Sequence, residues 1–187
     1  MIIALTGTPG TGKTTVCGII SEHSQYRKLY SIIEINKLIL DEGLHSGKDE
    51  ESDSYIADFE KLERRVKELI SRSQERDIIM EGHLSHFIPS DAIIVLRAHP
   101  MALRKRLGKR KEYSFKKVKE NANAEALDVI LVESSERSDK VFEIDTTNAN
   151  ALAVVKSVIS IIESLKNKKI PEEFLPGKIN WIDQVEL

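Results

Sequence analysis

A short glycine-rich stretch near the N-terminus has the residue types and the spacing of a phosphate-binding loop. Residues 7–14, GTPGTGKT, match the pattern G-x-x-x-x-G-K-[ST] at every fixed position. Glycines allow a turn so tight that its backbone N–H groups point inward, where side chains would obstruct a phosphate. An apolar run precedes the stretch and a helical pattern follows it, so we expect a nucleoside triphosphate to bind here.

The polar residues of this stretch have separate expected roles. Lys13 can reach the β- and γ-phosphates, where charge builds up during phosphoryl transfer. The Thr14 hydroxyl can coordinate Mg²⁺, and the Thr15 hydroxyl can hydrogen-bond the α-phosphate. The predicted ATP-binding residues of the loop are Gly10, Thr11, Gly12, Lys13, Thr14 and Thr15.

Two further candidates follow the apolar run at residues 78–80. Glu81 ends this run, where a protein with such a loop places the carboxylate that holds Mg²⁺ or orients water; the plainer alternative is a surface carboxylate. His83 lies two residues further on, and its imidazole could orient or deprotonate a water, or hydrogen-bond the γ-phosphate. We therefore expect Thr14 and Glu81 to bind the metal, and Lys13, Glu81 and His83 to be catalytic. The other four histidines have no such context: His23, His45, His86 and His99.

A basic cluster follows in the second half of the chain. Its members are Arg104, Lys105, Arg106, Lys109, Arg110 and Lys111. Guanidinium groups are frequent partners of the charge that develops on phosphoryl oxygens. We expect a flap here that closes over the phosphates and excludes water, with Arg110 as its catalytic and ATP-binding arginine. Arg104 and Arg106 could equally form an exposed helix face, and Arg97, at the end of an apolar run, is a further candidate for phosphate contact.

Apolar runs alternate with helical patterns along the chain, which predicts a parallel sheet covered on both sides. Strands are expected at residues 2–5, 28–33, 78–80, 92–96 and 141–144. Helices are expected at residues 14–23, 33–40, 55–73, 100–107 and 149–165, with a long helix after Ser114 whose face runs from Phe115 to Val132. Residues 43–54 read as a loop. In the tail, Trp181 should pack on the body or on a partner, because exposure of an indole is costly.

Bulk composition limits the class of protein. The chain has 187 residues, enough for one domain with a sizeable core, and 31% of them are charged, as in globular proteins. Its formal net charge of −2 argues against a protein that coats nucleic acid. A single cysteine, Cys17, excludes a disulfide within the chain. We see no signal peptide and no apolar run long enough to cross a bilayer, so we expect a cytoplasmic protein with no membrane partner.

Several short motifs occur in an order that is typical of one family. They are residues 7–15, Glu81-Gly82-His83, Val95-Leu96-Arg97, Arg106-Leu107 with Arg110 and Tyr113, and Glu120-Asn121. Together they resemble the small adenylate-kinase-like family of archaea and eukaryotes that is linked to maturation of the small ribosomal subunit. The acid-x-His motif after the third strand is the most diagnostic of them. The resemblance covers about residues 1–165.

The resemblance implies a fold, an activity and a set of partners. It implies a three-layer α/β/α P-loop NTPase domain over residues 1–187 with a five-stranded parallel sheet, similar to nucleoside monophosphate kinases. A monophosphate-binding segment is expected at about 31–54, a short lid at about 108–118 and a tail at 166–187. The implied activity is phosphoryl transfer from ATP with Mg²⁺ to a nucleoside monophosphate, AMP first, with broad specificity and accompanying ATPase activity. Implied partners are a small-subunit ribosomal protein and pre-ribosomal RNA.

Two departures from the family pattern keep alternatives open. The R-G-Y of the family appears here as residues 110–113, RKEY, and an arginine expected in the monophosphate segment is replaced by Leu40. That guanidinium would pair bidentately with the acceptor's phosphate, so its loss gives more weight to an ATPase assembly factor with little kinase activity. An ATP-binding regulator that never cleaves also stays open. A guanine-nucleotide switch is disfavoured, because Asn36-Lys37 lacks the aspartate that would read guanine.

Overall fold

The computed structural model describes residues 1–49, 54–73 and 76–185, and the structural statements below concern these residues. Five parallel strands form the central sheet in the order β2-β5-β1-β6-β7. They are β1 (Ile2–Thr6), β2 (Tyr30–Glu34), β5 (Asp77–Glu81), β6 (Ala92–Arg97) and β7 (Val141–Asp145). Because all five run in the same direction, their carboxyl ends meet at one edge of the sheet. The predicted five-stranded α/β/α fold is thereby confirmed.

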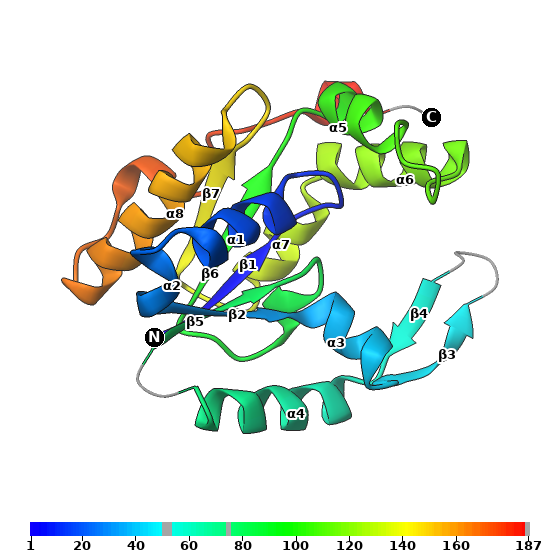
Figure 1. Cartoon of the computed structure of the whole chain (residues 1–187). Coiled ribbons are helices and arrows are strands. Elements are labelled where there is room, and N and C mark those ends of the chain that lie inside the picture. The colour runs from blue at the N-terminus through cyan, green and yellow to red at the C-terminus, as the bar shows by residue number, and fades with distance from the viewer. Residues whose placement is uncertain (50–53, 74–75, 186–187) are drawn as a thin grey trace.

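Alternate residues of the strands face two separate apolar layers, as expected for a parallel sheet buried on both faces. On β1, Ile3 and Leu5 pack with α1 (Lys13–Glu22) and α8 (Ala151–Lys166), whereas Ala4 faces the opposite layer. That second layer is covered by α3 (Ile35–Asp41), α4 (Phe59–Ser71) and α7 (Val129–Ser135). Figure 1 shows α1 and α8 on one side of the sheet and α4 on the other.

Further helices complete the chain. They are α2 (Tyr26–Leu29), α5 (Pro100–Leu107), α6 (Phe115–Ala126) and the 3₁₀ turns η1 (Ser85–Phe87), η2 (Glu172–Phe174) and η3 (Ile182–Gln184). Pro100 opens α5 because its fixed φ suits the first turn, and His99 accepts a hydrogen bond from the Met101 amide. Residues 108–114 connect α5 to α6 near the loop that follows β1 (Figure 1). Within the described part of the chain, no helix is both long and apolar enough to span a membrane.

The sequence predicted a loop at residues 43–54 and a helix that starts at residue 55, and both predictions are wrong. His45–Asp49 forms β3, which pairs antiparallel with β4 (Ser54–Ala57), so these residues make a separate two-stranded sheet. The helix begins only after Asp58, whose carboxylate accepts a hydrogen bond from the Lys61 amide at 3.1 Å. A strand of four residues is too short to show a clear alternation of apolar and polar side chains, and the helix starts where the aspartate caps it. Residues 50–53 of the predicted loop lie outside the described residues.

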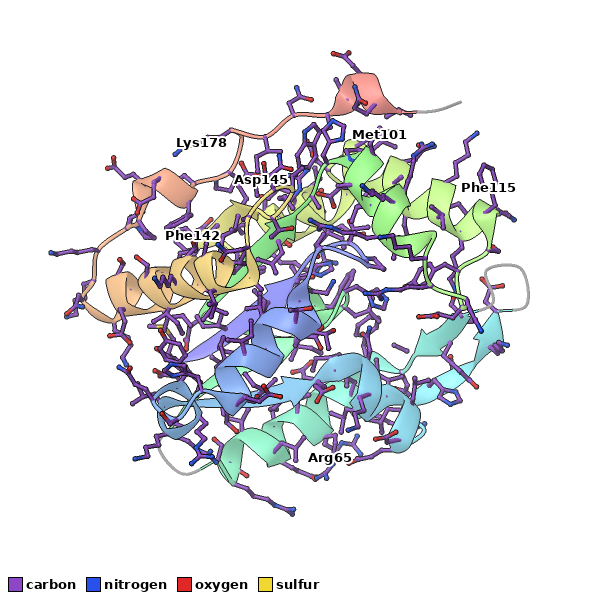
Figure 2. The ribbon with its side chains drawn as sticks, turned by 45° about the horizontal axis from the view of Figure 1, so that its top comes forward. Arg65, Met101, Phe115, Phe142, Asp145 and Lys178 are labelled. Atoms are coloured by element: carbon purple, nitrogen blue, oxygen red, sulfur yellow. The ribbon has the colours of Figure 1, made fainter. Side chains whose placement is uncertain are left out.

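The single long helix expected from residue 115 to 132 is also wrong. It is divided into α6 and α7 at Asp128, which has a φ of 56°. Aspartate tolerates this left-handed conformation better than most residues do, and its carboxylate ion-pairs with Arg97. The break changes the helical phase, so Val132 of the expected buried face is exposed. Phe115 is 85% exposed at the start of α6 (Figure 2).

Candidate active site

The glycine-rich loop connects β1 to α1 at the carboxyl edge of the sheet. Gly7, Gly10 and Gly12 all have positive φ angles, of 132°, 89° and 100°. A Cβ on Gly7 would lie 2.2 Å from the Leu96 carbonyl oxygen, so only glycine fits between the loop and β6. Gly12 precedes the first residue of α1, which directs the positive end of this helix at the loop. The backbone thus has the form that an anion-binding turn requires.

Lys13 is the buried cation of the loop. Its ammonium donates to the carbonyl oxygens of Gly7 at 2.5 Å and Thr8 at 3.1 Å, and the residue is 6% exposed. Burial lowers the pKa of Lys13 to about 8, although the nearby carboxylates of Glu81 and Glu125 oppose this shift. An anion in the loop would give this ammonium the counter-charge that would stabilise its protonated form.

Glu81 and Thr14 bring two oxygen ligands together. Glu81 ends β5, the neighbour of β1, and its Oε1 accepts a hydrogen bond from the Thr14 hydroxyl at 3.1 Å. Burial raises the pKa of Glu81, while the charge of Lys13 and the Thr14 hydrogen bond lower it. Mg²⁺ prefers hard oxygen ligands and commonly takes one or two from the protein and the rest from phosphates and water. The hydroxyl and carboxylate fit that donor set. The described residues hold no group of three or more acidic, His or Cys side chains that would bind a metal unaided.

His83 lies between the loop and α3. Its Nδ1 is 2.9 Å from the Asn36 side-chain nitrogen, which can only donate, so Nδ1 accepts and Nε2 carries the proton of the neutral ring. Burial, together with the nearby charge of Lys13, lowers the pKa of His83 to about 4, so the imidazole is neutral near pH 7. A neutral ring with a protonated Nε2 can donate a hydrogen bond to an anionic oxygen.

A cavity of about 390 Å³ unites most of the predicted site. The predicted residues that line it are Gly10, Gly12, Lys13, Thr14, Thr15, Glu81, His83 and Arg110. Thr11 does not reach this cavity: its hydroxyl donates to the Thr8 carbonyl at 2.9 Å. Thr11 instead lines a second cavity of about 220 Å³ on the other side of the loop, which it shares with Arg106 and Arg110. Arg110 therefore stands where the two cavities meet.

Residues outside the predicted site also line the larger cavity. They include Asn36, Tyr113, Lys117 and Asn121. Lys117 lies one turn after Tyr113, with its ammonium 6.0 Å from the centroid of that ring. Tyr113 and Asn121 belong to the motifs of the resemblance, and Lys117 lies one turn before Asn121 on α6, so a helical projection from Asn121 could have found it. Asn36 carries no such signal, since its role depends on how α3 packs.

The proposed phosphate contact of Arg97 is wrong. Arg97 is 1% exposed, and its guanidinium ion-pairs with Glu125 at 2.7 Å, with Glu143 at 3.2 Å and with Asp128. Its guanidinium is surrounded by three carboxylates and lines neither cavity beside the loop, so it is not placed to contact a phosphate there. Arg106 supports the loop from behind, because its guanidinium donates to the carbonyl oxygens of Gly10 at 3.2 Å and Thr146 at 2.7 Å.

A third cavity, of about 400 Å³, lies between α3 and β4. Asn36, Ser54 and His83 line both this cavity and the one at the loop, so the two are neighbours. The remaining lining residues are Ile39, Leu40, Tyr55, Ile56, Ala57, Phe59 and Leu84. The described lining contains no lysine or arginine, whereas Lys13, Arg110 and Lys117 line the adjoining cavity. One side of His83 is therefore cationic and the other apolar.

The fold and this loop together define a P-loop nucleotide-binding domain. A family model described as an AAA domain matches residues 3–128. The chain is 46% identical over 191 residues to a protein of Methanosarcina acetivorans named "Putative adenylate kinase", covering 99% of this chain and 100% of that one. It is 41% identical over 184 residues to the protein of the same name from Methanocaldococcus jannaschii, covering 98% and 94%. The chain belongs to this archaeal adenylate-kinase-like family.

Solved structures with the same fold are more distant in sequence. The YorR protein from Bacillus subtilis, solved in complex with phosphorylated GDP, has a TM-score of 0.59 at 20% identity and covers 89% of this chain and 98% of its own. Shikimate kinase from Acinetobacter baumannii, in complex with shikimate, has a TM-score of 0.57 at 15% identity, covering 88% and 94%. At these identities the likeness establishes the shared fold.

Proposed function

We propose that the protein transfers the γ-phosphoryl group of ATP to a nucleoside monophosphate, with AMP as the leading acceptor and broad specificity. The observation that carries this proposal is the pairing of two cavities at His83. One is cationic and contains the glycine loop, and the other is apolar and lies between α3 and β4. A phosphoryl donor and an acceptor bound in these cavities would meet beside His83. The names of the archaeal relatives point to the same reaction.

On the donor side, each residue of the loop cavity has a role that follows from its position. The backbone amides around Gly10 and Gly12 bind the phosphates, and Lys13 turns from the loop carbonyls to the β- and γ-oxygens. Thr14 and Glu81 hold Mg²⁺, and Thr15 binds the α-phosphate. Bound Mg²⁺ supplies positive charge to the oxygens on which charge develops during transfer.

Arg110 and His83 act at the transferred group. Arg110 lies on the connection between α5 and α6, which we propose to be the lid over the nucleotide, and contributes positive charge to the equatorial oxygens. His83 donates from Nε2 to the γ-phosphate, or orients water when the acceptor is absent. Proton abstraction by His83 would require Nε2 to be unprotonated, which the hydrogen bond from Asn36 disfavours.

The acceptor's phosphate needs a cation, and the hairpin cavity does not supply one from its described lining. Leu40 occupies the position at which the family resemblance places an arginine. Cations line the adjoining loop cavity, so we propose that two of them, Arg110 and Lys117, bind the acceptor's phosphate from the lid side. The apolar residues Tyr55 and Leu40 then remain for the base and sugar.

ADP formation from ATP in the presence of each nucleoside monophosphate tests the proposal. We expect AMP to stimulate ATP consumption at least tenfold over the rate without acceptor, and other monophosphates to stimulate it less. ADP should form at two molecules per ATP consumed when AMP is the acceptor. A rate that no monophosphate changes would contradict the kinase function.

A second candidate function is ATP hydrolysis by an assembly factor with little kinase activity. The lack of a cation in the described acceptor cavity favours it, because water could then compete with a weakly held monophosphate. The family resemblance suggests a role in small ribosomal subunit maturation, with a ribosomal protein and pre-ribosomal RNA as partners. Residues 41–63 carry nine Asp and Glu against two Lys, which would suit a basic protein partner. An ATPase rate unaffected by ribosomal proteins or RNA would dismiss this candidate.

A further inference from the structure

The C-terminal tail crosses the carboxyl edge of the sheet and covers a buried cluster of charges. Figure 1 shows the tail passing from the end of α8 to a position beside α5 and α6, and Figure 2 labels Lys178 on this segment. The Lys178 amide donates to Glu143 Oε1 at 2.9 Å. The Arg97 guanidinium carbon lies 5.2 Å from the centroid of the Trp181 ring, and the His99 ring meets the same indole edge-on at 5.7 Å. The tail is therefore bound by specific contacts.

The cluster beneath the tail is centred on Arg97. Its Nε donates to Glu125 Oε1 at 2.7 Å, and its other nitrogens reach Glu143 and Asp128. Arg97 and Glu125 are 1% and 3% exposed, so each depends on the other for charge compensation. The Trp181 indole lies on the guanidinium, where an aromatic face favours a cation. Loss of the indole would expose this cluster to water.

Glu125 connects the cluster to the phosphate-binding loop. Its Oε1 also accepts the Ala98 amide at 3.1 Å, and its Oε2 accepts the Thr8 hydroxyl. The Thr8 carbonyl in turn accepts hydrogen bonds from Lys13 Nζ at 3.1 Å and from the Thr11 amide at 3.2 Å. Every link from Trp181 to the loop is thus a direct contact between neighbouring side chains or their backbone. Asp128 and Glu143 anchor Arg97 on its remaining sides, which restricts the freedom of Glu125.

We propose that Glu125 is a positioning residue for the phosphate-binding loop, and that the C-terminal tail holds it in place through Trp181 and Arg97, so that tail docking and ATP binding are coupled. The proposal rests on the proposed function in assuming that the loop binds ATP, and its kinetic test also uses turnover with AMP. Coupling between two sites is reciprocal, so ATP must stabilise the docked tail by the same factor by which the docked tail improves ATP binding. Trp181 lines neither cavity beside the loop, so any response of the indole to ATP must pass through the protein.

Trp181 is the only tryptophan of the chain, which makes it a specific fluorescence probe. We expect its emission to change saturably when MgATP is added to the full-length protein, with a midpoint equal to the dissociation constant from calorimetry. In Glu125→Gln, which keeps the size of the side chain and removes its charge, the change should fall by at least half. If calorimetry shows that MgATP binds to the natural protein while the emission of Trp181 stays unchanged, this inference is overturned and the proposed function is not. A complete lack of ATP binding would overturn the proposed function as well.

Steady-state kinetics separates positioning from a general effect on folding. Trp181→Ala should raise KM for ATP about fivefold and leave KM for AMP unchanged, and Trp181→Phe should restore most of the difference. Ile182→Ala is the matched control, because Ile182 is the adjacent tail residue and is 52% exposed. Should Glu125→Gln not fold, the Trp181 series alone decides the matter. An unchanged KM for ATP in Trp181→Ala, or equal rises for both substrates, would overturn the proposal.

Discussion

The two sides of His83 are built in different ways. The loop on the proposed donor side is held from several directions: the Thr146 hydroxyl donates to the Thr11 carbonyl at 2.9 Å, Arg106 donates to the Gly10 carbonyl, and Glu125 accepts from Thr8. The cavity proposed for the acceptor is lined by α3 and β4, and Tyr55 and Ile56 of β4 are 47% and 54% exposed. One side is set by backbone geometry and buried polar contacts, and the other by a few partly exposed side chains.

This difference indicates which residues can be substituted while the proposed phosphoryl transfer is retained. A glycine loop that binds phosphate through its amides tolerates little change, since a Cβ on Gly7 would meet the Leu96 carbonyl oxygen at 2.2 Å. A cavity lined by Leu40, Tyr55 and Phe59 can change its ligand through single substitutions that leave the sheet untouched. We therefore expect donor-side mutations to have large effects on rate, and acceptor-side mutations to have smaller effects on acceptor affinity.

The largest expected effect follows from Lys13→Ala. Removing the buried cation of the glycine loop should lower kcat/KM for phosphoryl transfer by about 10²–10³-fold, as loss of one charged or donor group in a preorganised site commonly does. A coupled assay of ADP formation measures this. Lys105→Ala on the exposed side of α5 is the control and should change the rate less than twofold. A Lys13→Ala rate within tenfold of the natural protein would contradict the donor-side assignment.

A pH dependence of ATP affinity is the next largest effect. The pKa of Lys13 is about 8 in the free protein, and bound phosphates should raise it. Above pH 8 the free protein must take up a proton to bind ATP. The affinity for ATP should therefore fall by up to about tenfold per pH unit above pH 8, and it should change little between pH 6.5 and 7.5. Calorimetry in buffers of different ionisation enthalpy reports the proton uptake. Lys13→Ala should lose this pH dependence. If the natural protein binds ATP as tightly at pH 9 as at pH 7, the role assigned to Lys13 is contradicted.

One substitution should strengthen AMP binding if the proposed acceptor cavity lacks only a cation. Leu40→Arg should place a guanidinium beside the acceptor cavity and lower KM for AMP about tenfold, since a hydrogen-bonded charge pair contributes about 1.5–3 kcal/mol. KM for ATP should stay the same. Leu152→Arg, at a 60% exposed position on α8, is the control for added charge. No change in KM for AMP would show that the acceptor's phosphate lies elsewhere.

A smaller effect is expected from Lys117→Ala on the lid side. If Lys117 and Arg110 bind the acceptor's phosphate together, loss of one of them should raise KM for AMP about fivefold, or about 1 kcal/mol. Steady-state titration of AMP at saturating ATP gives this value. Lys116→Ala, which removes an exposed lysine 3.8 Å from Glu120, is the matched control. Equal effects of the two substitutions would argue against a specific contact.

The same contrast explains how far the sequence could predict the structure. The loop chemistry depends on consecutive residues, so the spacing from Gly7 to Thr14 was sufficient to predict its backbone form. Glu81 and His83 follow a strand next to β1, and parallel strands bring such residues to one edge. The prediction failed for Arg97, because its three carboxylate partners come from two helix ends and a strand that only the tertiary fold brings together. No periodicity in the sequence predicts that these three carboxylates surround Arg97 in the fold.

The acceptor side was less predictable for a related reason. The hairpin has five residues in β3 and four in β4, too few to show a period of two among polar residues. The contact between Asn36 and His83 depends on the angle at which α3 leaves β2, which local sequence does not determine. Leu40 was identified as a departure from the family pattern, but the apolar cavity it lines became visible only in three dimensions.

Calorimetric titration of MgATP into the natural protein and Lys13→Ala tests the central claim most directly. The glycine loop, its lysine and the Thr14–Glu81 oxygen pair predict one saturable site per chain that weakens when Mg²⁺ is removed. They also predict at least tenfold weaker binding in the lysine variant. Absence of binding to the natural protein, or equal affinities of the two proteins, would contradict the account.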